Sequence, residues 1–163
     1  MASLAAAILA MLLTIPIWAG SEFSAPKEAT AACPVTKPNG STPPGEQMLG
    51  PSSHGNGELW VALWPEGGKV VFRPGGPGFV LPDGALSMKF GWWRGGRGKL
   101  TIKGRRLDAP APPLRASIPD GYGDTGFQAT ALIFPTVGCW EVTGKVGNGK
   151  SLTFVTQVIK VAK

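Results

Sequence analysis

Residues 134–146, FPTVGCWEVTGKV, decide the fold of this 163-residue chain. A proline and a glycine mark a turn, and the alternating segment that follows places Trp140 and Val142 on one face. The loop GNGK at 147–150 then leads into a second β-rich run at 151–161. The pattern predicts a closing β-hairpin that Trp140 anchors in the core.

The rest of the chain shows short apolar or alternating runs between glycines and prolines. The 24 glycines and 16 prolines separate these runs instead of forming one tract, which indicates tight turns. Helical periodicity is missing outside the N-terminal stretch, so we expect an all-β sandwich of about seven to eight strands. Besides the closing hairpin, strands are expected at 58–64, 69–73, 79–81 (a strand or an apolar plug), 86–93, 99–105, 114–118 and 128–134.

Two further hairpins are expected among these strands. Residues 58–64 should pair with 69–73, and residues 86–93 should pair with 99–105 across a tip formed by RGGR at 94–97. Alternation within residues 86–93 predicts an inward face made of Leu86, Met88, Phe90 and Trp92.

The N-terminus carries an uncharged apolar stretch at 4–18, shorter than the ~20 residues of a membrane span. We interpret residues 1–31 as a secretory signal peptide with a short signal helix, cleaved after Ala19 or after Ala31. Residues 32–57, rich in Pro, Gly and Ser, should form an extended arm that is loosely held apart from its cysteine. The β domain is then 58–163.

The chain has two cysteines, Cys33 and Cys139, and an exported protein would oxidise them to one disulfide. Cys139 precedes the inward Trp140, so the bridge should lie outside the sandwich and clamp the arm. Two alternatives remain: a pair of free thiols, or a lipoprotein in which TAAC at 30–33 acts as a lipobox and Cys33 carries a lipid.

The segment 134–142 resembles the Pro-x-x-Gly-x-aromatic-x-hydrophobic start of the penultimate strand in bacterial immunoglobulin-like domains. In style the chain is similar to small, uncharacterised exported bacterial proteins that carry such a domain. The resemblance implies an immunoglobulin-like sandwich in which Trp140 fills the corner between the sheets. It implies no activity.

Residues 89–106 hold seven basic residues and no acidic one, within a chain of net charge +6. An outward Trp93 beside cations is typical of a recognition surface, because the ring stacks on a ligand and the cations bind anions. Burial of Trp93 under the arm is the competing interpretation. The candidate binding residues are Trp93, Arg94, Arg97, Lys99, Arg105 and Arg106.

These observations favour a non-catalytic binding module, secreted or at the cell envelope. Its partners would be anionic glycans, lipid headgroups or a protein, whereas nucleic acid is not the partner expected in that compartment. Two alternatives are an envelope hydrolase with a carboxylate or His54 centre, and a structural protein that inserts its loops at 74–78 and 110–113 into a partner. We expect no cofactor and no metal, and we interpret DGYGD at 120–124 as a turn.

Overall fold

The computed structural model of the protein describes residues 32–46, 50–64 and 67–162. Within these ranges the chain forms ten strands and one short 3-10 helix, η1 (Gly50–Ser52), so the all-β prediction is confirmed. The strand number exceeds the expectation because very short strands are added to the longer ones. The predicted signal peptide and its helix lie outside the described residues. No helix in the described ranges has the length and apolarity that crossing a bilayer requires.

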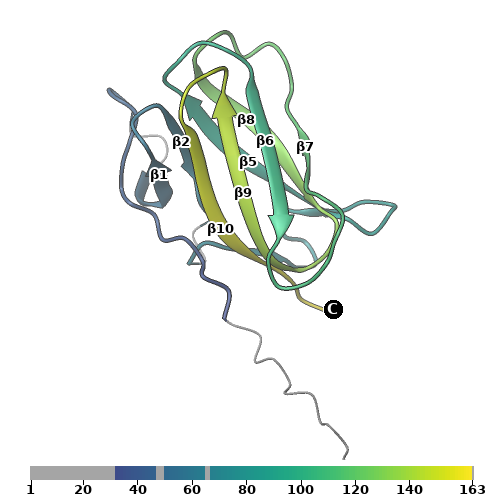
Figure 1. Cartoon of the computed structure of the whole chain (residues 1–163). Helices are drawn as coiled ribbons and strands as arrows, with labels where there is room; N and C mark the ends of the chain where they lie inside the picture. The colour runs from purple at the N-terminus through teal and green to yellow at the C-terminus, as the bar shows by residue number, and fades with distance from the viewer. Residues whose placement is uncertain (1–31, 47–49, 65–66, 163) are drawn as a thin grey trace, which may run out of the picture.

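Two sheets lie face to face, with β6, β9 and β10 in front of β5 and β8 in Figure 1. In sheet A the order is β1 (Ser53–Gly55), β2 (Leu59–Ala62), β5 (Leu86–Arg94), β8 (Gly126–Phe134) and β7 (Arg115–Ser117), and β4 (Phe79–Val80) also pairs with β5. In sheet B the order is β3 (Lys69–Phe72), β10 (Ser151–Lys160), β9 (Gly138–Val146) and β6 (Leu100–Arg106). Only β3 and β10 run parallel among the described pairs.

The core fills the space between the sheets with side chains from alternate positions of each strand. The expected inward residues of β5 are confirmed, since each is at most 2% exposed: Leu86, Met88, Phe90 and Trp92. Aromatic rings join the two layers: the ring centroids of Trp92 and Phe154 are 6.0 Å apart, and those of Phe134 and Trp140 are 5.8 Å apart. Such pairs add specific geometry to the burial of apolar area.

The closing hairpin is confirmed, because β9 and β10 are antiparallel neighbours with Lys145 opposite Ser151. The other two expected hairpins are wrong. β2 lies in sheet A and β3 in sheet B, and β5 and β6 are likewise in different sheets. Each of these four strands turns an apolar face to the common core, and alternation reports that face without reporting which strand lies alongside.

The arm is more ordered than expected. It contributes β1, which pairs with β2, so sheet A begins before residue 58. The Asn39 side chain donates to the Gly55 carbonyl over 2.8 Å and accepts from the Gly55 N–H over 3.1 Å. Ser41 accepts a hydrogen bond from the indole of Trp60. Polar side chains therefore fix the arm along the edge of sheet A. Phe79 and Val80, expected as a strand or a plug, form the two-residue strand β4 and are exposed.

Gly144 gives a test of the inter-sheet packing. A Cβ atom at this position would lie 2.5 Å from the Trp92 ring, whereas at Gly96 nothing lies within 4 Å. We expect Gly144→Ala to lower the free energy of unfolding by about 1–3 kcal/mol through overpacking. Gly96→Ala should change it by less than about 0.5 kcal/mol. Urea denaturation followed by tryptophan fluorescence measures both, and equal effects would contradict the packing described here.

Candidate functional site

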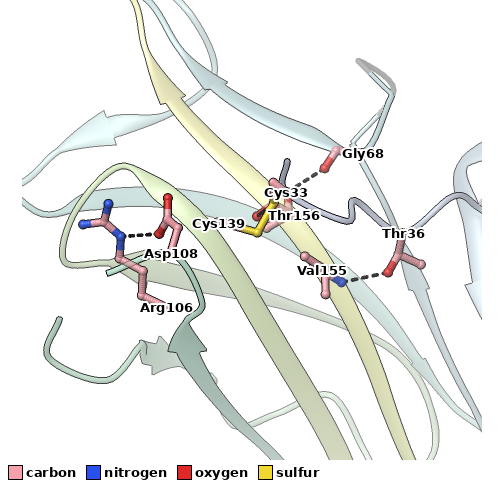
Figure 2. Close-up of a disulfide and its surroundings, with 8 residues drawn as sticks. All are labelled: Cys33, Thr36, Gly68, Arg106, Asp108, Cys139, Val155 and Thr156. Atoms are coloured by element: carbon pink, nitrogen blue, oxygen red, sulfur yellow. Dashed lines mark hydrogen bonds and ion pairs between the residues drawn. A yellow bond between two sulfur atoms is a disulfide. The ribbon is translucent and has the colours of Figure 1, made fainter. Parts of the chain in front are cut away.

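A disulfide joins Cys33 of the arm to Cys139 of β9, across a sequence separation of 106 residues. Figure 2 shows it on the outer face of sheet B, next to Thr156 of β10. The expected pairing and position are both confirmed. The Cys33 sulfur in this bridge cannot also carry a thioether-linked lipid, so the disulfide and the lipoprotein interpretation are mutually exclusive at that residue.

The arm is hydrogen-bonded to β10 beside the disulfide. The Thr36 N–H donates to the Val155 carbonyl over 2.9 Å, and the Thr36 hydroxyl accepts from the Val155 N–H over 2.8 Å. The Thr156 hydroxyl donates to the Gly68 carbonyl, which links β10 to the turn before β3. Figure 2 shows the contact of the Thr36 hydroxyl with Val155 and the contact of Thr156 with Gly68. The arm thus covers one part of the outer face of sheet B.

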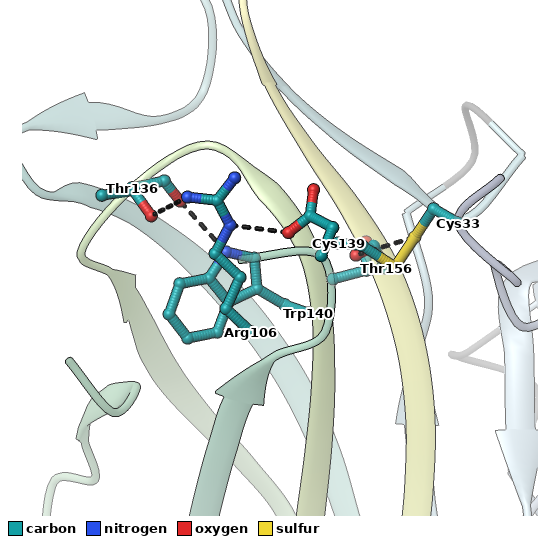
Figure 3. Close-up of polar contacts among 7 residues, drawn as sticks. Cys33, Arg106, Thr136, Cys139, Trp140 and Thr156 are labelled. Atoms are coloured by element: carbon teal, nitrogen blue, oxygen red, sulfur yellow. Dashed lines mark hydrogen bonds and ion pairs between the residues drawn. A yellow bond between two sulfur atoms is a disulfide. The ribbon is translucent and has the colours of Figure 1, made fainter. Parts of the chain in front are cut away.

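Arg106, a predicted binding residue, is the last residue of β6 and is engaged in side-chain hydrogen bonds. It is the cross-strand partner of the fully buried Trp140. Its guanidinium lies beside Asp108 in Figure 2 and beside Thr136 in Figure 3. Its Nε donates to the Asp108 carboxylate over 2.6 Å, and its Nη1 donates to the Thr136 hydroxyl over 3.2 Å. A hydrogen bond from Arg106 holds the pKa of Asp108 below its ordinary value, and burial opposes this only in part. Gly138 leaves room for this guanidinium, since a Cβ there would collide with it.

The other predicted site residues do not form one surface. Trp93 is half-buried on the outer face of sheet A, between its cross-strand partners Trp60 and Phe127. Arg94, expected as an exposed cation at a hairpin tip, is only 4% exposed, so that expectation is wrong. Arg97 and Lys99 are exposed in the connection between the sheets. Arg105 lies on the outer face of sheet B, opposite the face that carries Trp93.

Three exposed cations on β6 and β9 of sheet B form a second arrangement, here named the cationic face: Lys103, Arg105 and Lys145 with Thr101, Thr143, Ser151 and Thr153. The four strands of this sheet carry six basic residues and one acidic residue, Glu141. Glu141 accepts from Arg105 over 2.8 Å. Lys103 and Lys145 are exposed, and no ion pair engages either one among the described residues.

Lys145 was not predicted as a site residue. Alternation along 138–146 places it on the face of Cys139, Glu141 and Thr143, so the signal was present in the sequence. No signal in the sequence indicates that Lys145 lies near Lys103, because this proximity depends on the pairing of β6 with β9 across about forty residues of chain. Thr101 lies opposite Lys145 and Lys103 lies opposite Thr143, which makes the two lysines diagonal neighbours.

The candidate catalytic and metal positions stay dispersed. His54 lies on β1, and burial lowers its pKa, although a backbone hydrogen bond to Lys37 acts in the other direction. Its Nδ1 is buried without a partner. In the described ranges no three residues among His, Cys, Asp and Glu come together as metal ligands.

Comparison with known proteins gives no family to which the chain can be assigned. No family model, no curated protein and no solved structure matches it.

The Arg106–Asp108 contact predicts a pH dependence. The folded-state pKa of Asp108 is the depressed one, so its contribution is present above the ordinary value of 3.8 and lost as pH falls through the folded-state value. Asp108→Asn should lower the free energy of unfolding by about 1 kcal/mol at pH 7 and remove that part of the acid dependence. The control, Asp83→Asn, breaks a solvent-exposed pair with Arg115 and should have a smaller effect. Urea titrations between pH 2 and 7, in steps of roughly one pH unit, measure the free energy of unfolding of each variant. If the free energy of Asp108→Asn coincides with that of wild type at every pH, the predicted role of the Arg106–Asp108 contact is wrong.

Proposed function

We propose that the chain is a non-catalytic, extracytoplasmic binding module that holds phosphate-bearing polymers or membranes on its cationic face. The observation that carries the proposal is the pair Lys103 and Lys145, exposed on one sheet face with no acidic partner among the described residues. The surrounding Thr and Ser hydroxyls can donate hydrogen bonds to phosphate oxygens. A flat surface of this kind suits an extended polyanion better than a small ion.

The strand order supports an immunoglobulin-like sandwich as the scaffold. If β2, β5, β8 and β7 correspond to strands A, B, E and D, then β6, β9 and β10 correspond to C, F and G. At the start of β9, the Trp140 indole donates to the Thr136 carbonyl over 3.0 Å, as the tyrosine of a tyrosine corner bonds back to the preceding backbone. The disulfide departs from antibody domains, because it lies outside the sandwich instead of bridging the sheets.

The disulfide supports a location outside the cytosol. Disulfides persist in oxidising compartments and are rare in the cytosol. The apolar stretch at 4–18 supplies a matching export signal in the sequence. Together they favour a secreted or envelope protein, where phosphate polymers and lipid headgroups are available.

The non-catalytic part of the proposal rests on the surroundings of His54. A general base needs an oriented partner and access to a substrate proton. Within the described ranges the His54 Nδ1 is buried without a hydrogen-bond partner, and burial favours the neutral form of the ring. The hydrolase alternative would need a second group that the described part of the chain does not place beside it.

A second candidate function is contact with a protein partner through the loop at 73–81. Phe79 and Val80 are 61% and 51% exposed, and Val80 and Val161 line an apolar notch of about 330 Å³. Exposed apolar residues beside a notch favour a partner that buries them. Contact of this kind would survive high salt, whereas binding through the cationic face would not.

Charge reversal tests the proposed function. We expect Lys103→Glu/Lys145→Glu to weaken retention on immobilised poly(glycerol phosphate) by on the order of tenfold at low salt. The matched control Lys89→Glu/Lys160→Glu changes the net charge equally, with Lys89 on sheet A and Lys160 at the far end of β10. It should retain binding. Parallel sedimentation with phosphatidylglycerol and phosphatidylcholine vesicles separates a lipid source of phosphate from a polymer source. Unchanged retention of the first variant, or equal loss in both, would overturn the proposal.

A further inference from the structure

Most of the exposed large apolar side chains lie beside β4, at an edge of sheet A. Among the described residues five such side chains are exposed, and three of them are found here: Phe79 (61%), Val80 (51%) and Val161 (48%). Val80 and Val161 line the apolar notch of about 330 Å³, together with Phe72 at the end of β3. Contiguous exposed apolar surface marks an interaction site, whereas single exposed apolar residues are common on any protein. We call residues 78–81 and this notch the β4 edge.

The main chain of β4 is paired on one side only. Val80 lies opposite Leu86 of β5. The Leu81 N–H donates to the Ala85 carbonyl over 2.8 Å, so the main-chain groups of Leu81 face β5. Those of Val80 point away from β5 by the same alternation, and no second strand pairs with β4 among the described residues. Val80 therefore presents one main-chain donor and one main-chain acceptor at the outer side of the edge.

The other edges of the two sheets are protected against strand addition. The arm covers β1, where the Asn39 side chain bonds both main-chain groups of Gly55. The remaining edge strands carry exposed cations: Lys69 on β3, Lys103 and Arg105 on β6, and Arg115 on β7. Charged side chains on an edge strand oppose its pairing with another chain. Among the described edge strands, β4 alone has neither a charged residue nor a covering segment.

A second copy of the chain complements the main chain of Val80. Two β4 strands that run antiparallel about a two-fold axis place Val80 opposite Val80, and the two residues exchange both N–H···O bonds. Phe79 of each copy then lies opposite Leu81 of the other, which is partly exposed. Pro77 and Pro82 have no N–H, so they limit the pairing to the residues between them. Because both copies use the same surface, the contact closes as a dimer.

We propose that the protein forms a weak symmetric dimer in which the β4 edge of one copy covers the β4 edge of the other. The proposal rests on the second candidate function, contact with a protein partner through the loop at 73–81, and names that partner. It does not rest on the cationic face. A patch of a few side chains is smaller than the about 800 Å² per partner of a standard interface, so we expect a Kd of about 0.1–1 mM.

The charges at the notch give the dimer a characteristic salt dependence. Arg73 and Lys160 line the notch, and no acidic residue does. Two copies that meet at this edge bring like charges together, and dissolved salt screens their repulsion. Salt should therefore strengthen the dimer, whereas it weakens the binding of a polyanion to the cationic face.

The test is a dilution series of the full-length oxidised protein labelled with nitrogen-15, from about 2 mM to about 20 µM. In sedimentation equilibrium the mean mass should rise with concentration toward that of a dimer, more steeply in about 500 mM NaCl than in about 50 mM NaCl. In NMR spectra the amide signals of residues 78–81 and 161 should move with concentration, and the Val80 amide should exchange more slowly in concentrated samples. A monomer at every concentration, or masses that grow beyond a dimer, would overturn the proposal.

Two variants with the same change distinguish the β4 edge from other exposed apolar positions. Val80→Lys gives β4 the kind of charge that the other edges carry, and it should raise the Kd of the dimer at least about tenfold. Val137→Lys changes the net charge equally at an exposed valine between β8 and β9, and it should leave the Kd unchanged. Equal effects of the two variants, or concentration-dependent signals that exclude residues 78–81, place the association elsewhere and contradict the proposal.

The result can be separated from that for the cationic face. In about 500 mM NaCl, where the change in net charge is screened, Lys103→Glu/Lys145→Glu should dimerise as wild type does. Val80→Lys should still be retained on poly(glycerol phosphate) at low salt, at about 10 µM protein, where wild type is monomeric. Loss of dimerisation in Lys103→Glu/Lys145→Glu would place the dimer contact on the cationic face and overturn the proposal.

Discussion

The alternation of β9 at Cys139 and Trp140 constrains the rest of the structure. Successive side chains of a strand point to opposite faces, so burying Trp140 obliges Cys139 to face outward. Trp140 is fully buried, and its indole N–H is satisfied by Thr136 at the corner where the chain crosses between sheets. A shift of one residue would expose the indole and bury Glu141. The disulfide therefore forms on the outer face of sheet B, and the arm is held there.

The position of the arm divides that outer face into two parts. Next to the disulfide, the outward residues of β10 are partly buried: Val155, Gln157 and Ile159. Val155 is also hydrogen-bonded to Thr36 of the arm. At the other end, the outward residues Ser151 and Thr153 are exposed, and Thr143 and Thr153 share a hydrogen bond of 2.8 Å. The cationic face occupies this uncovered end. Its side chains carry charges or hydroxyl groups, as is usual for a sheet face in contact with water. Because the arm does not cover them, a partner can reach them.

Sequence patterns predicted which residues of a strand face the core better than they predicted which strands are neighbours in a sheet. The inward residues of β5, the closing hairpin and the outward cysteine could all be predicted, because each follows from alternation within one segment. The separation of β2 from β3, and of β5 from β6, could not, since both members of each pair bury an apolar face in the same core. A Gly-rich connection such as RGGR at 94–97 serves a crossing between sheets as well as a hairpin.

The candidate site was affected by the same limit. Arg94 follows four apolar inward residues on β5 and shares their parity, so its burial is consistent with the alternation, but its hydrogen bonds come from a loop some thirty residues later in the sequence. Trp93 and Arg105 are twelve residues apart and lie on opposite outer faces. The basic residues that are close in the sequence are therefore separated in the structure: Arg94 is buried, and Arg106 pairs with Asp108. Lys103 and Arg105 lie on an exposed face that also includes Lys145.

We infer that the sandwich core stays folded without the disulfide and that the disulfide holds the arm across sheet B. In the chain-entropy model a bridge over a loop of this length contributes about 4–5 kcal/mol, which is largely the cost of closing the loop. The most direct measurement is amide hydrogen exchange of the oxidised and the reduced protein under native conditions. The account predicts that reduction speeds exchange in the described arm residues, among them Thr36 and Gly55, while β5, β8, β9 and β10 stay protected. Loss of protection throughout those four strands, or an arm whose exchange is unchanged, would contradict it.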